Sequence, residues 1–200
     1  MFRRNLIPAW VAIIMVASMY LMGQGWSPTP PTGPPAPVPK TGQTTYYGVG
    51  DDGYWEKGVE WPIPRFVYNG NGTVTDNLTG LIWTQDADCD GLKEWYPALD
   101  YCNNLAESAC GLADGSAPGD WRLANRSELE SLLDMENIDP ALPTGHPFTD
   151  VRWDDLYWTS TSYVVHVYDA AWAVGLYDGS VQDAYKDYDE AYVWCVRGGQ

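Results

Sequence analysis

Seven of the thirteen residues from Ser27 to Pro39 are prolines, and this run limits where a folded domain can lie. Proline fixes φ and lacks a backbone N–H, so the run cannot enter a helix interior or a central strand and favours an extended polyproline II strut. It also separates an apolar N-terminal segment from everything that follows. We therefore expect a Pro/Gly-rich spacer over residues 26–58 and one folded domain over residues 59–200, long enough to bury a core.

The first 25 residues have the pattern of an export signal. Arg3 and Arg4 precede an uncharged, mostly apolar run from Leu6 to Met22. A short basic segment followed by an apolar segment is typical of a secretory signal peptide, whereas an uncleaved segment of this length can serve as a signal anchor. The sequence leaves both alternatives open for residues 1–25. In either case we predict that the rest of the chain is exported (secreted, periplasmic or at the cell surface) and meets a membrane only through this segment, if it is uncleaved.

The charge balance excludes some classes of partner. The chain has 27 acidic and 11 basic residues, a formal net charge of −16 at pH 7. Nucleic-acid-binding proteins neutralise phosphates with a basic surface, so we expect no nucleic-acid partner and no attraction to an anionic membrane surface. Trp and Tyr are abundant, at 11 and 14 residues, whereas Phe occurs 3 times. Such amphipathic rings suit half-exposed faces.

Strand-like segments lie at both ends of the expected domain. Gly70-Asn71-Gly72 separates residues 65–69 from residues 73–75, a pattern that predicts a β-hairpin. Further strands are expected over residues 81–84, 157–162, 171–176, 180–183 and 191–196. In the last of these the side chains alternate, so Trp194 and Cys195 should face opposite sides.

Two helices are expected between these strands. Residues 94–108 carry an apolar stripe at helical spacing, formed by Trp95, Leu99, Cys102 and Leu105. Asn125 with Glu128 three residues later has the pattern of a capping box, which predicts a helix ending near residue 134. Residues 136–155 are punctuated by Pro, Asp and Gly and predict a long loop. Helices early and strands late indicate an α+β fold rather than repeated βαβ units.

Five segments of the expected domain follow the order and spacing of a known family. They are TGLIW at 79–83, DWRLANRSEL at 120–129, YWTST at 157–161, AW at 171–172 and YVWCVRGG at 192–199. Together they resemble the Lcl C-terminal domain family of exported bacterial domains, over about residues 65–200, with Ala124 in place of the family's usual proline. The resemblance implies a C-type-lectin-like fold, with two helices packed on small antiparallel sheets, long loops and two disulfides. It also implies roles in adhesion and ligand binding, and a distant relationship to formylglycine-generating enzymes.

The four cysteines all follow the export signal, in a compartment where disulfides persist. Four cysteines allow three pairings. The pairing that we expect from the lectin-like resemblance is Cys102–Cys195 with Cys89–Cys110, the first of which joins the first helix to the last strand. A redox or metal site of paired thiols is disfavoured, because no Cys-x-x-Cys spacing is present.

One acidic loop has the spacing of a Ca²⁺ site. Asp86, Asp88 and Asp90 alternate, Gly91 occupies the sixth position, and Glu94 follows. Position twelve is Pro97 instead of the bidentate glutamate of an EF-hand, so a site here would be completed from elsewhere. The alternative is a solvated acidic turn before the first helix, favoured there by the helix dipole. Both interpretations stay open, and no cofactor other than Ca²⁺ is indicated.

A set of aromatic residues is the second candidate site. These residues fall between the family motifs, where a lectin-like fold displays its variable surface: Tyr163, His166, Tyr168, Tyr177, Tyr185 and Tyr188. Flat rings with a polar tip stack on the apolar faces of sugars and lose little rotamer entropy in doing so. The alternative is ordinary surface or edge packing. The strongly negative charge favours a neutral glycan or a protein as the ligand.

These features favour an exported, surface-associated binding module over an enzyme. The chain has two histidines, which lack the spacing of a metalloprotease helix, and no Gly-x-Ser-x-Gly nucleophile motif. We therefore expect recognition or adhesion without catalysis. The alternative is a structural subunit of an extracellular assembly, in which the aromatic face is buried in a homo-oligomer. A more remote alternative is an enzyme of the formylglycine-generating type, which would need reactive cysteines.

Overall fold

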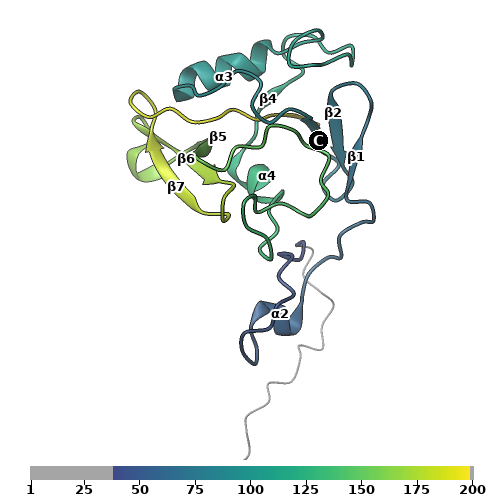
Figure 1. Ribbon diagram of the computed structural model, residues 1–200. Coiled ribbons are helices and arrows are strands. Elements are labelled where there is room, and N and C mark those ends of the chain that lie inside the picture. The colour runs from purple at the N-terminus through teal and green to yellow at the C-terminus, as the bar shows by residue number, and fades with distance from the viewer. Residues whose placement is uncertain (1–37, 199–200) are drawn as a thin grey trace, which may run out of the picture.

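Two antiparallel sheets organise residues 38–198, the part of the chain that the computed structural model describes (Figure 1). One sheet has the strand order β1-β2-β3-β8-β4, and the other has the order β5-β6-β7. The strands are β1 (Phe66–Tyr68), β2 (Thr73–Asp76), β3 (Ile82–Thr84), β4 (Arg122–Leu123), β5 (Leu156–Ser162), β6 (Ala170–Gly175), β7 (Val181–Tyr185) and β8 (Cys195–Arg197).

The helices are short and lie outside the sheets. They are α2 (Asp52–Trp55), α3 (Trp95–Asn104), α4 (Arg126–Glu130) and the 3₁₀-helix η1 (Val164–His166). None of the helices within residues 38–198 has the length and apolar character needed to span a bilayer. The predicted signal segment, residues 1–25, and the first part of the predicted spacer, residues 26–37, lie outside the described residues. The structure agrees with the predicted fold in its general features: it is a small, mostly sheet domain with three α-helices and two disulfides.

The predicted hairpin is confirmed. Strand β1 pairs antiparallel with β2, with Tyr68 opposite Val74. The turn between them needs glycine, because Gly72 has a φ of +80° and a Cβ there would lie 2.3 Å from the carbonyl oxygen of Gly111. Close backbone approach at this turn joins the hairpin to the loop after α3.

Both predicted helices are present, and both end earlier than expected. Helix α3 stops at Asn104 because Leu105 is already extended and the chain beyond it folds back, with the Glu107 N–H donating to the Ser116 carbonyl at 3.0 Å. The predicted capping box of α4 is confirmed: the Glu128 N–H donates to Asn125 Oδ1 at 3.0 Å, and the Asn125 N–H donates to Glu128 Oε2 at 2.8 Å.

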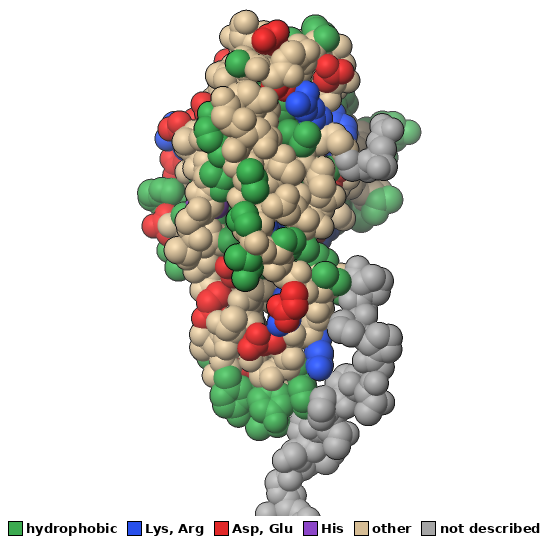
Figure 2. All heavy atoms as spheres, turned by 90° about the vertical axis from the view of Figure 1, so that its right-hand side faces the viewer, with side chains coloured by type: hydrophobic (Ala, Val, Ile, Leu, Met, Phe, Trp, Pro, Cys, Tyr) green, Lys and Arg blue, Asp and Glu red, His purple; other side chains and the backbone are tan. Residues whose placement is uncertain are grey.

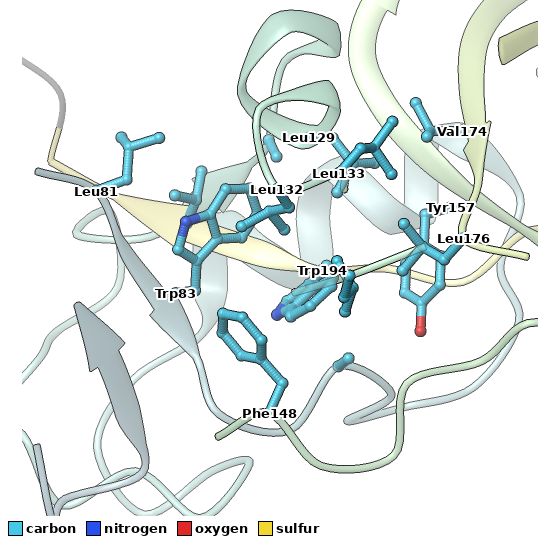
Figure 3. Close-up of a cluster of buried hydrophobic side chains, with 14 of the residues drawn as sticks. Leu81, Trp83, Leu129, Leu132, Leu133, Phe148, Tyr157, Val174, Leu176 and Trp194 are labelled. Atoms are coloured by element: carbon cyan, nitrogen blue, oxygen red, sulfur yellow. The ribbon is translucent and has the colours of Figure 1, made fainter. Parts of the chain in front are cut away.

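The last predicted strand separates two parts of the core. Trp194 and Val196 lie in one buried cluster, and Val193 and Cys195 lie in the other, as the alternation predicted. Only residues 195–197 form β8, because Tyr192 bridges to Tyr157 of β5 instead of pairing with β3 or β4. Figure 3 shows Trp194 in the middle of the first cluster, with other aromatic rings around it.

Both expected disulfides are confirmed. Cys102 of α3 and Cys195 of β8 are joined, with their Cα atoms 5.5 Å apart, and Cys89 is joined to Cys110. Cys102 and Cys195 are both buried within the second core cluster. The first disulfide therefore fixes the packing of α3 against the last strand.

Residues 38–64 form an N-terminal lobe, which contains α2 and lies below the sheets in Figure 1. A parallel bridge between Pro39 and Val59 closes the lobe. The carboxylate of Glu136 holds it to the rest of the domain, because it accepts hydrogen bonds from the Thr44 N–H at 2.7 Å, the Thr45 N–H at 2.8 Å and the Thr45 hydroxyl. The sequence predicts a spacer over most of this region, so the fold of the lobe and its helix α2 differ from that expectation.

The contact at Glu136 should respond to acid. These hydrogen bonds lower the pKa of Glu136 from 4.5 to about 2, because they stabilise the ionised carboxylate. The contact should therefore be fully formed above pH 4.5 and be lost as the pH falls through about 2. Amide chemical shifts of Thr44 and Thr45, followed by NMR during an acid titration, should show this transition. Glu136→Gln should abolish it, and Glu107→Gln, at an exposed site elsewhere, should leave it unchanged; a transition that survives Glu136→Gln contradicts the assignment.

Candidate functional site

A surface hollow lies beside the loop that precedes β5. It has a volume of about 500 Å³ and is lined by Trp153, Asp154, Asp155, Leu156, Gly175, Tyr177, Asp178, Ser180 and Gln182. A second hollow of about 550 Å³ shares Asp155, Leu156 and Gln182 with the first and continues along Asp183, Ala184, Tyr188, Asp189, Glu190, Ala191 and Glu94. Because they share three lining residues, we treat the two hollows as one feature, the Trp153–Tyr188 groove.

An exposed aromatic pair stands at one end of this groove. The rings of Trp153 and Tyr177 lie 6.3 Å apart, centroid to centroid, and are inclined at 47°. Trp153 is 53 % exposed, whereas tryptophan side chains in folded proteins are on average largely buried. Rings held open to solvent beside polar groups are suited to stacking against a ligand that is apolar on one face and polar at its edges.

The loop that carries Trp153 is anchored by the preceding residue, Arg152, through both its side chain and its backbone. The Arg152 side chain forms an ion pair with Asp88, with Nε 2.7 Å from Oδ2, and the Arg152 N–H donates to the buried Tyr157 hydroxyl at 2.8 Å. Burial raises the pKa of Tyr157, so this phenol remains protonated and neutral. Arg152 therefore positions Trp153 without itself lining the groove.

Negative and neutral polar groups make up most of the rest of the groove, together with Leu156, Ala184 and Ala191. None of its lining residues is Lys or Arg, and seven of them carry carboxylates: Glu94, Asp154, Asp155, Asp178, Asp183, Asp189 and Glu190. The Ser180 N–H donates to Asp178 Oδ1 at 2.9 Å and lowers the pKa of Asp178, so that this group stays ionised. A ligand with hydroxyl or other donor groups fits such a lining, and an anionic ligand does not.

A comparison with known protein families identifies the family of the domain that carries this groove. Residues 72–197 match the profile of the Lcl C-terminal domain, which is more than half of the chain. The chain belongs to the Lcl C-terminal domain family. No curated protein was found to match the sequence. All residues that line the groove fall within the matched Lcl C-terminal domain, whereas the N-terminal lobe lies before it.

Of the six aromatic residues expected to contact a ligand, two line the groove of the Lcl C-terminal domain. Tyr177 and Tyr188 line opposite ends of the groove. Tyr163 and His166 lie beside each other, 6.0 Å apart between ring centroids, where β5 connects to β6, and exposed Tyr168 follows in the same connection. Tyr185 is exposed on β7 but lines neither hollow.

Trp153, the exposed tryptophan of the groove, was not among the predicted site residues. Trp153 lies in the loop that had been given no role, although the triplet Trp153-Asp154-Asp155 joins a large ring to two carboxylates. Such a triplet in a region without helical or strand periodicity is the signal that could have found it. Trp172 of the AW segment is half-buried against Tyr163 and Arg126.

The acidic loop uses its carboxylates in different ways. Asp88 pairs with Arg152, and Asp90 pairs with Lys93, whose Nζ lies 2.5 Å from Oδ2. Asp86 accepts the Asp88 N–H at 2.8 Å, and burial is the main cause that raises its pKa. Glu94 belongs to the groove.

The structure does not bring these four carboxylates together around one point. Within residues 38–198, one group of three residues has potential metal-ligand atoms within 4.8 Å of one another: Asp86, Cys89 and Cys110. Both of these cysteines are in a disulfide. Cations of the protein itself neutralise two of the four carboxylates. Calcium binding at Asp86, Asp88, Asp90 and Glu94 therefore stays a prediction, which the geometry of the described residues does not strengthen.

Proposed function

We propose that this protein is an exported, surface-associated binding module that recognises a neutral carbohydrate in the Trp153–Tyr188 groove and carries out no catalysis. The observation that carries the proposal is the exposed Trp153–Tyr177 pair beside a polar hollow. The N-terminal export pattern supports its location. For the architecture we propose a C-type-lectin-like domain, which the disulfide between α3 and β8 and the two small antiparallel sheets support.

The lining of the groove accounts for the choice of ligand. Sugar rings expose C–H faces that stack on Trp and Tyr, and their hydroxyls donate to carboxylates such as Asp178 and to the Gln182 amide oxygen. Sulfated or otherwise anionic glycans would face the carboxylates without a lining cation. A protein ligand that presents hydroxyl or basic side chains is compatible with the same lining.

The cysteines support a role without catalysis. All four are paired in the two disulfides, and none is free. Chemistry of the formylglycine-generating type depends on reactive cysteines, so this chain has no thiol to offer for it. A thiol titration of the native protein that finds free cysteine would revive the enzymatic alternative.

The carbohydrate proposal is tested with neutral oligosaccharides. We expect a glycan array to yield neutral binders, and isothermal titration with the best of them to show that Trp153→Ala weakens binding by about tenfold or more, the equivalent of ~1.4 kcal/mol. Tyr168→Ala is the matched control, because Tyr168 is also highly exposed but lies outside the groove. Binding restricted to anionic glycans, or an equal loss with Tyr168→Ala, would count against the proposal.

One observation favours the alternative of a structural subunit. Val164, Val165 and Val167 are exposed next to Tyr168, in the connection from β5 to β6. The buried Lys186 holds this connection in place, because its Nζ donates to the Val167 carbonyl at 2.7 Å. Large oligomers in size-exclusion chromatography that Val165→Asp dissociates would support assembly through this surface.

A further inference from the structure

The end of the N-terminal lobe carries an uncharged aromatic surface. Its residues are Tyr46, Tyr47, Val49, Tyr54 and Trp55, which we call the aromatic tip. Four of the five are exposed, Tyr47 at 82 %. Figure 2 shows hydrophobic side chains gathered over the lower end of the molecule, the end that α2 occupies in Figure 1. This surface lies before the matched family domain and has no part in the groove.

The backbone of the lobe holds these rings outward. The carboxylate of Asp51 accepts hydrogen bonds from the N–H groups of Tyr47 at 2.8 Å, Gly48 at 3.1 Å and Tyr54 at 2.8 Å. Gly53 lies against the backbone of Thr45, where a Cβ would come within 2.1 Å of the carbonyl oxygen. The backbone at Gly53 packs directly on the backbone at Thr45, which leaves no room for a large ring between them. The rings of the tip therefore lie outside this contact.

The rings of the tip contact one another at the surface. Tyr46 and Tyr54 lie 5.6 Å apart between ring centroids, and Tyr54 and Trp55 lie 4.6 Å apart. The nearest carboxylates in the sequence are engaged within the lobe: Asp51 by backbone N–H groups, Asp52 by the Thr41 hydroxyl, and Glu56 by Lys40 at 3.5 Å. The tip therefore presents uncharged Tyr and Trp side chains beside engaged carboxylates, on a chain whose net charge is −16.

The chain enters the described structure at this lobe. The Val59 N–H donates to the Val38 carbonyl at 2.7 Å, and the Lys40 N–H donates to the Val59 carbonyl at 3.1 Å, so residue 38 is fixed there. The uncharged run Leu6–Met22 precedes it in the sequence. Even a fully extended connection from Met22 to Val38 spans no more than about 55 Å. A bilayer that contained residues 6–22 would therefore lie no farther than this distance from the point where the chain enters the lobe.

We propose that the aromatic tip contacts the headgroup region of a neutral phospholipid bilayer. Tyr and Trp concentrate at membrane–water interfaces, where the ring enters the acyl boundary while the hydroxyl or indole N–H stays hydrated. The acidic chain repels anionic lipids, so the contact is to zwitterionic headgroups. This contact orients the domain at the membrane, and it does not depend on which ligand the groove binds.

The test uses the full 200-residue chain in phosphatidylcholine vesicles, with the photoreactive residue p-benzoylphenylalanine in place of Tyr47. The control carries it in place of Tyr188, which is 86 % exposed but lies in the groove, outside the lobe. We expect mass spectrometry after irradiation to find lipid adducts at position 47 and only background at position 188. Val49→Asp should reduce the adducts at position 47, because it places a charge in the contact.

Three outcomes overturn the proposal. Equal adducts at positions 47 and 188 would show that the vesicle surface does not orient the domain. No adducts at position 47 would show that the tip stays in water. Cross-links from position 47 to a second copy of the chain, in place of lipid, would show that the tip serves self-association.

Discussion

Replacing Cys102 and Cys195 together by alanine should lower the free energy of unfolding by about 4–5 kcal/mol in the chain-entropy model. The two residues are separated by 93 positions, so the disulfide closes most of the domain into one loop and removes many conformations from the unfolded chain. Both sulfurs lie in the second core cluster, where alanine leaves no unpaired polar group. Urea denaturation without reductant, followed by circular dichroism, measures the loss.

The second disulfide gives the matched control. Cys89 and Cys110 are separated by 21 positions, and the same model gives a smaller loss of about 3 kcal/mol for the Cys89→Ala/Cys110→Ala variant. The order of the two losses is the essential result. If the Cys102→Ala/Cys195→Ala variant proves as stable as the wild-type chain, the packing of α3 against β8 does not depend on the covalent link.

Features governed by neighbouring residues could be predicted from the sequence. The hairpin at Gly70-Asn71-Gly72 and the capping box of Asn125 with Glu128 each depend on local hydrogen bonds and backbone angles. The alternation of Trp194 and Cys195 across the core follows from strand geometry alone. In each case the residues that decide the structure lie within a few positions of one another.

The N-terminal lobe could not be predicted in this way. Its residues are rich in Gly, Tyr and Asp and show no helical or strand period. Their attachment depends on Glu136, about ninety positions further along the chain, whose carboxylate binds Thr44 and Thr45. A contact between segments so far apart leaves no local signal.

The candidate site shows the same limit. The groove joins Trp153, from a loop, to Tyr177 in the turn between β6 and β7 and to Tyr188 after β7. Tyr177 and Tyr188 were predicted as contacts because they are aromatic, but only the fold shows that Trp153 stands beside Tyr177. Likewise, the acidic loop resembles a cation site when only neighbouring residues are considered. Its partner Arg152, which neutralises Asp88, lies 64 positions away and leaves no local signal.

Replacing Trp194 by alanine should lower the free energy of unfolding by about 3–5 kcal/mol, the usual cost of removing a large buried aromatic ring. Trp194 is 1 % exposed, and its ring packs edge-on against Phe148 at 4.8 Å and Trp83 at 5.5 Å, so alanine leaves a cavity that neighbouring side chains cannot fill without moving. Its indole N–H also donates to the Thr84 carbonyl at 3.0 Å. That carbonyl would lose its partner.

A comparison with exposed Trp153 separates this effect from a general cost of losing tryptophan. Trp153→Ala should leave the free energy of unfolding within about 0.5 kcal/mol of wild type, as is usual for a surface substitution. Trp194→Phe should be less costly than Trp194→Ala, because it retains most of the ring volume and loses only the hydrogen bond to Thr84 and part of the packing. Equal losses for Trp153→Ala and Trp194→Ala in urea denaturation would mean that the packing of Trp194 in the first core cluster does not stabilise the domain more than an exposed tryptophan does.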